Sequence, residues 1–337
     1  MLRLKMTKGE TMKKAFVLGG TGFLGYHTVN VLLEDGYEVI ALSLPPMPVE
    51  DLFDERVENH LGDVNDMSDE QLLELMKGCS DFVYAIGADE RWLPDKPAFK
   101  SFYQANVLPT QRIARLCVKA GIKNFVLYGS YFSEFAEKLP QFKLNTMGYP
   151  ATRLLQEQIA YAEGEGSMCV TTLRLPYIFG TMPGRVPLWK MFTDLIKGQE
   201  TYPYPSGKTA SVSAHQVAQA TLGALKHGVH RQSYAISDTN ISHKRFYELM
   251  VEALGQQNTT QLISLPYEAW VSQYQAADDR ADSLGKEHGI HIVLSQRMNN
   301  EDLSIDPQDT IDILGYDRVD DMEGLIRETL KACVEAE

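Results

Sequence analysis

The strongest chemical signal in the sequence is a glycine-rich loop near the N-terminus. It has the form Gly-x-x-Gly-x-x-Gly and consists of Gly19, Gly20, Thr21, Gly22, Phe23, Leu24 and Gly25. An apolar run typical of a strand precedes it, and a helical pattern follows it. In that setting the first glycine permits a tight turn, the second lets the backbone approach a pyrophosphate, and the third lets helix and strand pack closely. Because N–H groups at a helix start bind phosphate, the loop predicts a dinucleotide site.

The residue that ends the second predicted strand, residues 37–42, should select between the two common dinucleotides. A carboxylate there binds the 2′-hydroxyl of NAD, whereas a basic residue accommodates the 2′-phosphate of NADP. The position holds Ser43, followed by Leu44 and two prolines. With neither a repelling carboxylate nor an arginine at this point, the sequence slightly favours NADP over NAD.

A single asparagine interrupts an otherwise apolar helix face. Asn106 lies on the stripe that also contains Phe102, Pro109, Ile113, Cys117 and Ala120. A buried polar side chain must be hydrogen-bonded, so Asn106 is either a structural residue or part of a site. Because Pro109 lacks the N–H that would bond the carbonyl of Ala105, we expect the helix to kink beside Asn106.

These residues require a scaffold whose strands end at a common edge. Short apolar runs at residues 15–18, 37–42, 81–86, 124–128 and 170–173 alternate with helical patterns. The alternation predicts βαβ crossovers and an α/β fold with a doubly wound parallel sheet. We expect a Rossmann domain over residues 13–180, to which residues 209–237 return. A smaller C-terminal substrate lobe comprises residues 181–208 and 238–337.

Further short motifs follow the glycine loop along the chain. They are Gly62-Asp63-Val64, Gly87-Ala88, Asn106-Val107, Leu173-Arg174-Leu175, Ile178-Phe179-Gly180, Leu314-Gly315-Tyr316 and Met322-Glu323-Gly324-Leu325. With the loop, they resemble the NAD-dependent epimerase/dehydratase family, the extended short-chain dehydrogenases, over about residues 13–330. The resemblance implies that Asp63 and Val64 contact adenine, that Gly87 and Ala88 pass the nicotinamide ribose, and that Pro176 also contacts the cofactor. It gives Asn106 a role in holding a water molecule or the active-site residue at position 153.

The resemblance also implies a catalytic pair, because Ser130 and Tyr149 align with the family's catalytic serine and tyrosine. The implied reaction is hydride transfer between the nicotinamide and a substrate carbon. Tyr149 would act as acid or base, and Ser130 would bond the carbonyl or hydroxyl group. The usual tyrosine pKa of about 10 is too high for this role, so a cation one helical turn further on is needed to lower it.

The cation at that position departs from the family pattern. The family's Tyr-x-x-x-Lys reads Tyr149-Pro150-Ala151-Thr152-Arg153 in this chain. Arginine keeps the positive charge and can donate to ribose hydroxyls, but it does not give up a proton. Arg153 could therefore lower the pKa of Tyr149 and bind the cofactor without relaying protons.

The sequence indicates the substrate only by class. The arginine with which sugar-nucleotide members bind the diphosphate aligns with Thr209, and Lys208 or Arg185 could substitute for it. Residues 89–91, which are all charged, either line the substrate pocket or form a solvated loop. We expect an NAD(P)-dependent oxidoreductase acting on a small carbonyl or hydroxyl compound, a sugar derivative among the candidates. The alternatives are a nucleotide-sugar epimerase or dehydratase and, in another class, a catalytically weak dinucleotide-binding sensor or scaffold, which Arg153 favours.

Composition restricts the partners and the compartment. The formal net charge of −13 disfavours nucleic acid and anionic membranes as partners. No apolar stretch is long enough to span a membrane or to form a signal peptide. Four isolated cysteines, without paired spacing, indicate neither a metal site nor disulfides. We therefore expect a cytoplasmic protein with a small-molecule substrate, and a homodimer formed by the helices that carry Asn106 and Tyr149.

The first twelve residues form a separate segment without apolar periodicity, which we expect to be a disordered leader. Lys8-Gly9-Glu10 can be encoded by AAA-GGA-GAA, which contains a bacterial ribosome-binding sequence shortly before the codon of Met12. The segment is therefore either a disordered tail or not part of the natural product, and the second interpretation indicates a bacterial source.

Overall fold

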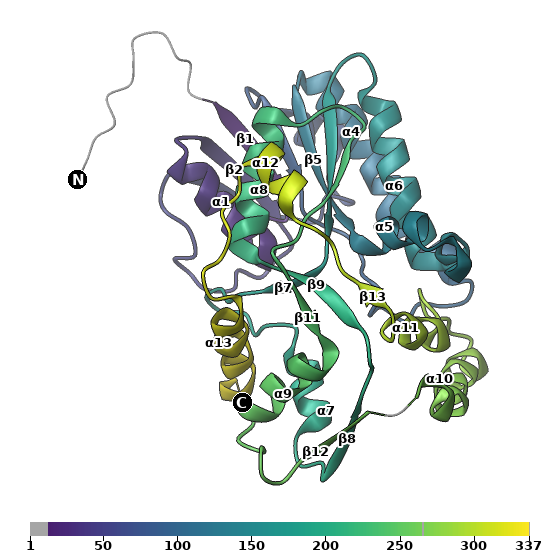
Figure 1. Cartoon of the computed structure of the whole chain (residues 1–337). Coiled ribbons are helices and arrows are strands. Elements are labelled where there is room, and N and C mark those ends of the chain that lie inside the picture. Colours follow the sequence, from purple (N-terminus) through teal and green to yellow (C-terminus); the bar gives the residue numbers. More distant parts are fainter. Residues whose placement is uncertain (1–12, 265, 337) are drawn as a thin grey trace.

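The computed structural model describes residues 13–264 and 266–336 and contains a central sheet of seven parallel strands (Figure 1). The strand order is β10-β6-β5-β4-β1-β2-β3, and every neighbouring pair is parallel. The strands are β1 (Lys14–Leu18), β2 (Glu38–Ser43), β3 (Val57–Leu61), β4 (Asp81–Tyr84), β5 (Asn124–Ser130), β6 (Cys169–Leu175) and β10 (Ser233–Ala235). The predicted doubly wound parallel sheet is confirmed. The predicted leader, residues 1–12, lies outside the described residues.

Helices cover both faces of this sheet. Helices α1 (Phe23–Glu34) and α8 (Ala214–His227) pack together on one face. Helices α2 (Asp69–Leu75), α4 (Leu108–Ala120) and α6 (Gly148–Gly164) lie on the other. Two shorter helices, α3 (Ala98–Phe102) and α5 (Tyr131–Lys138), pack against α6. The sheet is therefore buried on both sides, as the nearly continuous apolar character of its central strands requires.

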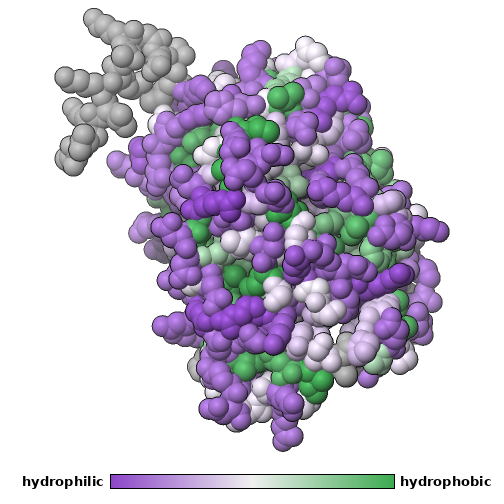
Figure 2. All heavy atoms as spheres, viewed as in Figure 1, coloured by the Kyte–Doolittle hydropathy of each residue, from purple (hydrophilic) through white to green (hydrophobic). Residues whose placement is uncertain are grey.

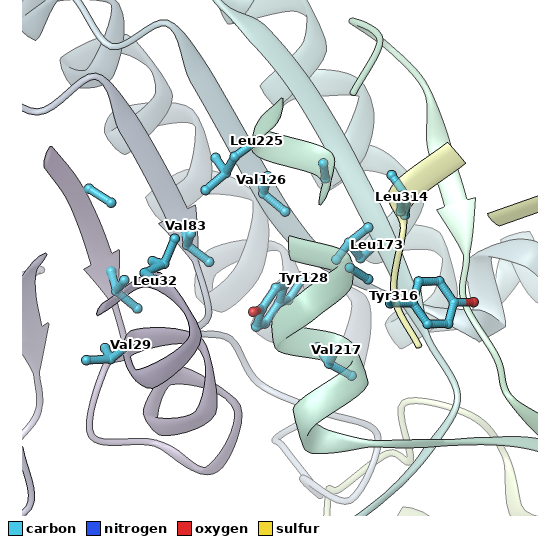
Figure 3. Packing of buried hydrophobic residues seen from close by; sticks show 14 of the residues in the cluster. Val29, Leu32, Val83, Val126, Tyr128, Leu173, Val217, Leu225, Leu314 and Tyr316 are labelled. Atoms are coloured by element: carbon cyan, nitrogen blue, oxygen red, sulfur yellow. The ribbon is translucent and has the colours of Figure 1, made fainter. Parts of the chain in front are cut away.

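Side-chain alternation along the strands divides the core into two layers. Figure 3 shows the layer under α1 and α8, where Leu32 of α1 and Leu225 of α8 lie in one cluster with Val83 and Val126 of the sheet. In the opposite layer the rings of Phe16, Phe82 and Phe125 stack across β1, β4 and β5, with successive centroids 5.2 and 5.1 Å apart. Since burial of each phenylalanine contributes about 1.5–3 kcal/mol to the stability of the fold, these stacked rings help to hold the three central strands in register.

The edge strand β3 has no counterpart among the sequence predictions. It reads Val-Glu-Asn-His-Leu, and its residues are exposed or half-buried because only one strand and few side chains cover it. Such a strand carries no apolar run, which is the signal on which the other strands were predicted.

The C-terminal part of the chain adds a smaller layer beneath the sheet (Figure 1). Its four-stranded sheet contains β7 (Tyr177–Phe179), β9 (Lys208–Ser213), β11 (Thr239–Ser242) and β13 (Asp302–Leu303), and β8 (Thr201–Tyr204) pairs separately with β12 (Gln261–Ser264). Its helices are α7 (Lys190–Ile196), α9 (His243–Ala253), α10 (Val271–Ser283), α11 (Ile292–Met298) and α13 (Met322–Glu335), whereas α12 (Gln308–Leu314) lies beside α8.

Two later segments of the chain return to the Rossmann core. Of the residues expected to return there, 214–235 do so as α8 and β10, whereas β9 pairs within the smaller sheet. Late in the chain, α12 packs on α8, and Leu314 and Tyr316 are buried in the same core layer as the inner side chains of α8. The lobe boundaries given above stay a prediction.

The helix that carries Asn106 is interrupted at the expected place. Residues Tyr103–Val107 form a π-helical turn between α3 and α4, and Pro109 follows in the first turn of α4. The disruption that Pro109 predicts therefore takes the form of a π turn rather than a simple bend. Asn106 sits in this turn and is fully buried.

The face of the molecule shown in Figure 2 is mostly polar, with hydrophilic residues predominating and hydrophobic ones in scattered patches. Within residues 13–264 and 266–336, no helix combines the length and apolar character that crossing a bilayer requires.

Candidate cofactor-binding and active site

The predicted site residues lie along one edge of the parallel sheet. Gly19 follows β1, Ser43 ends β2, Asp63 follows β3, Gly87 follows β4, and Ser130 ends β5. Pro176 follows β6, whose last residue pairs with Ser130. All of these positions are at the carboxyl ends of the strands, where open α/β sheets bind their ligands.

The glycine loop leaves a cradle at the start of α1. A Cβ atom on Gly25 would lie 2.0 Å from the carbonyl oxygen of Gly19, so only glycine lets the helix pack this close to the strand. Gly22 is the N-cap residue of α1, and no side chain caps the helix there. The first turn of α1 contains no acidic residue. The N–H groups of this turn, with Phe23 and Leu24, are therefore free to bind a pyrophosphate, and the residues present fit a dinucleotide.

Ser43 is bound to the glycine loop. Its hydroxyl oxygen accepts a hydrogen bond of 2.9 Å from the backbone N–H of Thr21. On the opposite side of the same residue, the Nε–H of Arg185 donates to the Thr21 carbonyl over 3.1 Å. The end of β3 is tied in as well, because the N–H of Gly62, which precedes Asp63 and Val64, donates to the Ser43 carbonyl.

Asn106 holds the loop that follows β4. Its Oδ1 accepts from the backbone N–H of Ala88 at 2.8 Å, and its Nδ2 donates to the Ala88 carbonyl at 3.0 Å. The family resemblance implied that Asn106 holds a water molecule or the residue at position 153. That role stays a prediction. In the structure both ends of the amide are paired with the backbone of Ala88, because the π turn brings them opposite that peptide. Asn106 thus acts as a positioning residue for the loop Gly87-Ala88.

Tyr149 and Ser130 lie together in a largely apolar setting. Tyr149, in the first turn of α6, is 4% exposed and packs edge-to-face with Phe102 and Phe132. Ser130 is 5% exposed and caps α5, because its hydroxyl accepts a hydrogen bond from the N–H of Phe132. Hydrogen bonding by Ser130 also lowers the pKa of Tyr149, by less than burial raises it. The ends of β5 and α6 therefore bring the two predicted catalytic hydroxyls to one place.

Arg153 is one helical turn from Tyr149 and directed at the same loop. Its guanidinium lies 5.8 Å from the centre of the Tyr149 ring and donates through Nη2 to the Tyr128 carbonyl. Its Nε–H is buried without a partner among the described residues. A Cβ atom on Gly87 would come within 3.2 Å of its Nη1 and 3.0 Å of Asn106 Oδ1. Glycine at position 87 therefore lets the loop pass between these two side chains.

The pKa of Tyr149 differs from the sequence expectation. Burial raises the pKa of its hydroxyl to about 12, and the positive charge of Arg153 lowers it by less than burial raises it. Glu90, an exposed carboxylate just beyond the loop Gly87-Ala88, contributes a smaller upward effect. Arg153 thus acts in the expected direction, but the expected low pKa is wrong because desolvation of the hydroxyl outweighs the charge.

A loop from the C-terminal part of the chain supports Tyr149 from outside the Rossmann domain. The N–H of Tyr149 belongs to the first turn of α6 and has no partner within the helix. It donates to the carbonyl of Gly289 over 2.9 Å. A Cβ atom on Gly289 would lie 2.6 Å from the Phe102 ring and 2.8 Å from Tyr149 Cβ, so the loop packs directly on the tyrosine.

A buried ion network fixes the elements that carry the catalytic pair. Arg174 on β6 is 3% exposed and binds three carboxylates, those of Glu134 and Glu137 on α5 and Glu157 on α6. Glu157 is fully buried and pairs with Arg174 through two hydrogen bonds of 3.2 and 2.8 Å. This network joins the helix that begins after Ser130 to the helix that carries Tyr149.

Two contacts at the site were not predicted from the sequence. Gly289 shows no periodicity or motif that would place it against Tyr149. Arg185 was considered only for a substrate diphosphate, and nothing in its neighbours indicates contact with the glycine loop. Both come from segments far from their partners along the chain.

The described residues contain no group of three or more histidines, cysteines or acidic residues arranged for a metal ion.

Fold and site together define a Rossmann-type dinucleotide-binding protein. The chain belongs to the NAD dependent epimerase/dehydratase family, whose model matches residues 15–237. Membership makes it an enzyme of the extended short-chain dehydrogenase type, with a nicotinamide dinucleotide as its class of cofactor.

Individual relatives differ in reaction. A Synechocystis protein provisionally named dihydroflavonol 4-reductase is 36% identical over 115 residues, which are 34% of this chain and 32% of that protein. The bovine (Bos taurus) sterol-4-alpha-carboxylate 3-dehydrogenase, decarboxylating, is 29% identical over 188 residues, 52% of this chain and 50% of the enzyme. The matched region spans about a third to a half of these relatives. A UDP-glucuronic acid 4-epimerase from Bacillus cereus, solved in complex with NAD, has the same fold, with a TM-score of 0.68, 13% identity, and coverage of 96% of this chain and 100% of that one.

Proposed function

We propose that this protein is an NAD(P)-dependent oxidoreductase that acts on a small carbonyl or hydroxyl compound, with Tyr149 as the proton-transferring residue. The observation that carries the proposal is the grouping of Ser130, Tyr149 and Arg153 beside the loop Gly87-Ala88. That loop is itself next to the glycine loop, since a Cβ atom on Gly19 would lie 2.6 Å from the Ala85 carbonyl oxygen. A dinucleotide in the cradle would extend along this edge toward the hydroxyl pair.

The residues divide the chemistry between them. The bound nicotinamide supplies or accepts the hydride. A tyrosine with a pKa of about 12 keeps its proton at neutral pH, so Tyr149 is ready to donate to a carbonyl oxygen that gains negative charge. Ser130 offers a second hydrogen bond to that oxygen. The fixed charge of Arg153 stabilises the tyrosinate left behind, because the attraction strengthens as Tyr149 becomes negative. This arrangement favours reduction of a carbonyl compound.

A nucleotide-sugar epimerase or dehydratase is the second candidate, supported by family membership. Its substrate diphosphate would need a cation near position 209, where Thr209 is fully buried. Lys208, one of the two possible substitutes, is bound to Asp302 with an Nζ–Oδ2 distance of 3.0 Å. The other, Arg185, is held at the glycine loop by its bond to the Thr21 carbonyl, where a cofactor rather than a substrate would bind. These contacts favour a substrate without a diphosphate.

A non-catalytic sensor or scaffold remains the candidate of another class. Its support is the arginine at position 153, since a guanidinium cannot replace the lysine as a proton relay. Ser130 and Tyr149 are both buried and lie next to each other, which favours the enzyme instead.

We propose NADP as the preferred cofactor. Ser43 supplies no negative charge at the end of β2, and its hydroxyl is already bound to Thr21. A 2′-phosphate would therefore meet no repulsion there.

We also propose a cytoplasmic homodimer formed by the helices that carry Asn106 and Tyr149. Four large apolar side chains are exposed on α3, the π turn, α4 and α6, namely Phe99, Tyr103, Leu108 and Leu155, with 36–44% of their surface accessible. Packing these helices against a second copy would cover them. Light scattering at micromolar concentration should give the dimer mass, and Leu155→Glu should lower it. A monomeric wild type would exclude this arrangement.

The decisive experiment for the function is Tyr149→Phe. Thermal-shift screening with NAD, NADP, UDP-sugars and small carbonyl compounds first identifies ligands, because a ligand that binds only the native state raises its stability. On any substrate that the wild type turns over, Tyr149→Phe should abolish turnover and leave cofactor affinity nearly unchanged. An unchanged rate would show that Tyr149 is not catalytic.

A further inference from the structure

Arg185 lies at the place where a dinucleotide's adenosine ribose would meet the end of β2. It follows β7, where the chain leaves the Rossmann sheet for the smaller layer, and reaches back to the glycine loop. Ser43 and Arg185 bind opposite ends of one residue, the first through the N–H of Thr21 and the second through its carbonyl. The side chain that ends β2 and the guanidinium are therefore close neighbours.

The path of the chain holds Arg185 there. Gly184, immediately before it, has a φ of +72° and no room for a side chain, because a Cβ atom would lie 2.5 Å from the Pro48 carbonyl oxygen. The segment is also tied at its start, where His27 Nε2 is 3.0 Å from the Thr181 carbonyl oxygen. The loop thus runs directly over the segment that follows β2 and over the start of α1.

The guanidinium retains unused donors. Its Nε–H is bound to Thr21, whereas its terminal nitrogens have no hydrogen-bond or ion-pair partner in the described part of the chain, and the residue is exposed. The segment after β2, residues 44–49, contains no charged residue. A guanidinium anchored by one donor, with four remaining, is well suited to bind a phosphate through two parallel hydrogen bonds.

We propose that Arg185 binds the 2′-phosphate of NADP and selects it over NAD, an inference that rests on the proposed function. The cation that dinucleotide-binding folds often carry at the end of β2 is absent here, and the loop after β7 supplies it instead. Ser43 completes the subsite, because its O–H can donate to the phosphate while its oxygen accepts from Thr21.

The test measures binding rather than turnover. Isothermal titration calorimetry on the full-length protein with NADP and NAD, and with 2′,5′-ADP and 5′-AMP as probes, isolates the 2′-phosphate. Arg185→Met should weaken NADP and 2′,5′-ADP by about 10- to 100-fold, the range for a lost charge-assisted contact, and change NAD and 5′-AMP by less than about threefold. Arg185→Lys should restore part of the loss.

Two further variants control the interpretation. Arg56→Met removes the same charge from the segment between β2 and β3, where Arg56 pairs with Asp54, and should leave the NADP to NAD ratio unchanged. Gly184→Ala keeps Arg185 but displaces it, so it should reproduce the selective loss.

The outcomes separate the inference from the function on which it rests. Equal losses for NADP and NAD in Arg185→Met would overturn the inference, since they would mean that Arg185 only fastens the loop. So would a wild type that prefers NAD. In both cases the proposed NAD(P)-dependent oxidoreductase stands, although the second outcome also removes the proposed preference for NADP. A wild type that binds neither dinucleotide would refute both.

Discussion

Replacing Gly289 by alanine tests whether a loop outside the Rossmann domain sets the position of Tyr149. The new methyl group would lie 2.6 Å from the Phe102 ring and 2.8 Å from Tyr149 Cβ. Ordinary van der Waals contact begins at 3.4 Å, so it is too close by about 0.8 Å to Phe102 and about 0.6 Å to Tyr149. Because Tyr149 also donates its N–H to Gly289, it cannot move away without lengthening that bond.

The expected effect follows from the size of this displacement. A misplacement of about 1 Å costs a catalytic group about 100-fold in rate, so we expect kcat to fall by about 10- to 100-fold. Overpacking should lower the free energy of unfolding by about 1–3 kcal/mol. The glycine loop is distant from this contact along the sheet edge, so the dissociation constant of the cofactor should stay within about twofold. The assay is kcat at saturating cofactor, with the cofactor dissociation constant and the unfolding free energy measured in parallel.

Gly285→Ala is the matched control. Gly285 belongs to the same segment and has a φ of +68°, so alanine strains its backbone by about 1–2 kcal/mol. No heavy atom lies within 4 Å of the added Cβ, and nothing is pushed toward Tyr149. If the two variants lost the same amount of activity, the rate would follow general stability, and the positioning role of Gly289 would be refuted.

Four further predictions follow from the site and its supports. Gly22→Val should abolish dinucleotide binding in calorimetry while circular dichroism stays native, because Gly22 has a φ of −76°, which valine adopts, and its nearest neighbour for a Cβ is at 3.1 Å. Arg153→Ala should reduce both turnover and cofactor affinity, whereas Arg153→Lys should keep or raise turnover; activity appearing only in Arg153→Lys would favour the scaffold. Arg174→Met leaves buried Glu157 without its cation and should cost about 3–5 kcal/mol in urea unfolding, and a loss under 1 kcal/mol would contradict the role of the network. Burial lowers the pKa of His243 to about 4. Below pH 6.5, His243 is therefore protonated in the unfolded chain but stays neutral in the folded chain down to about pH 4. Stability should therefore fall by up to about 3 kcal/mol as the pH drops from 6.5 to 4, and His243→Gln should lack this part of the loss.

The sequence predicted the residues of the sheet edge because their signals are local. A glycine triplet between a strand and a helix, or a serine at the end of an apolar run, carries its own context within a few positions. The doubly wound fold followed from the same alternation. Contacts such as those of Gly289 with Tyr149 and of Arg185 with Thr21 depend on how distant segments meet. No spacing rule reports such contacts, and they could be found only in the folded chain.

The pKa of Tyr149 could not be predicted from the sequence either, in this case because it depends on burial. From the sequence, a cation one turn away predicts a lowered pKa, since charge is the only influence that spacing reveals. The structure adds the burial of the whole Tyr149 side chain and the packing of its ring against Phe102 and Phe132, which remove water from it. Because loss of hydration penalises only the tyrosinate, burial outweighs the charge of Arg153 and keeps the proton on Tyr149. An arginine that never gives up its proton is compatible with this arrangement, since a tyrosine that starts protonated needs only a stabilising charge while it donates. The burial of the site and the identity of residue 153 therefore both favour the same direction, reduction of a carbonyl group.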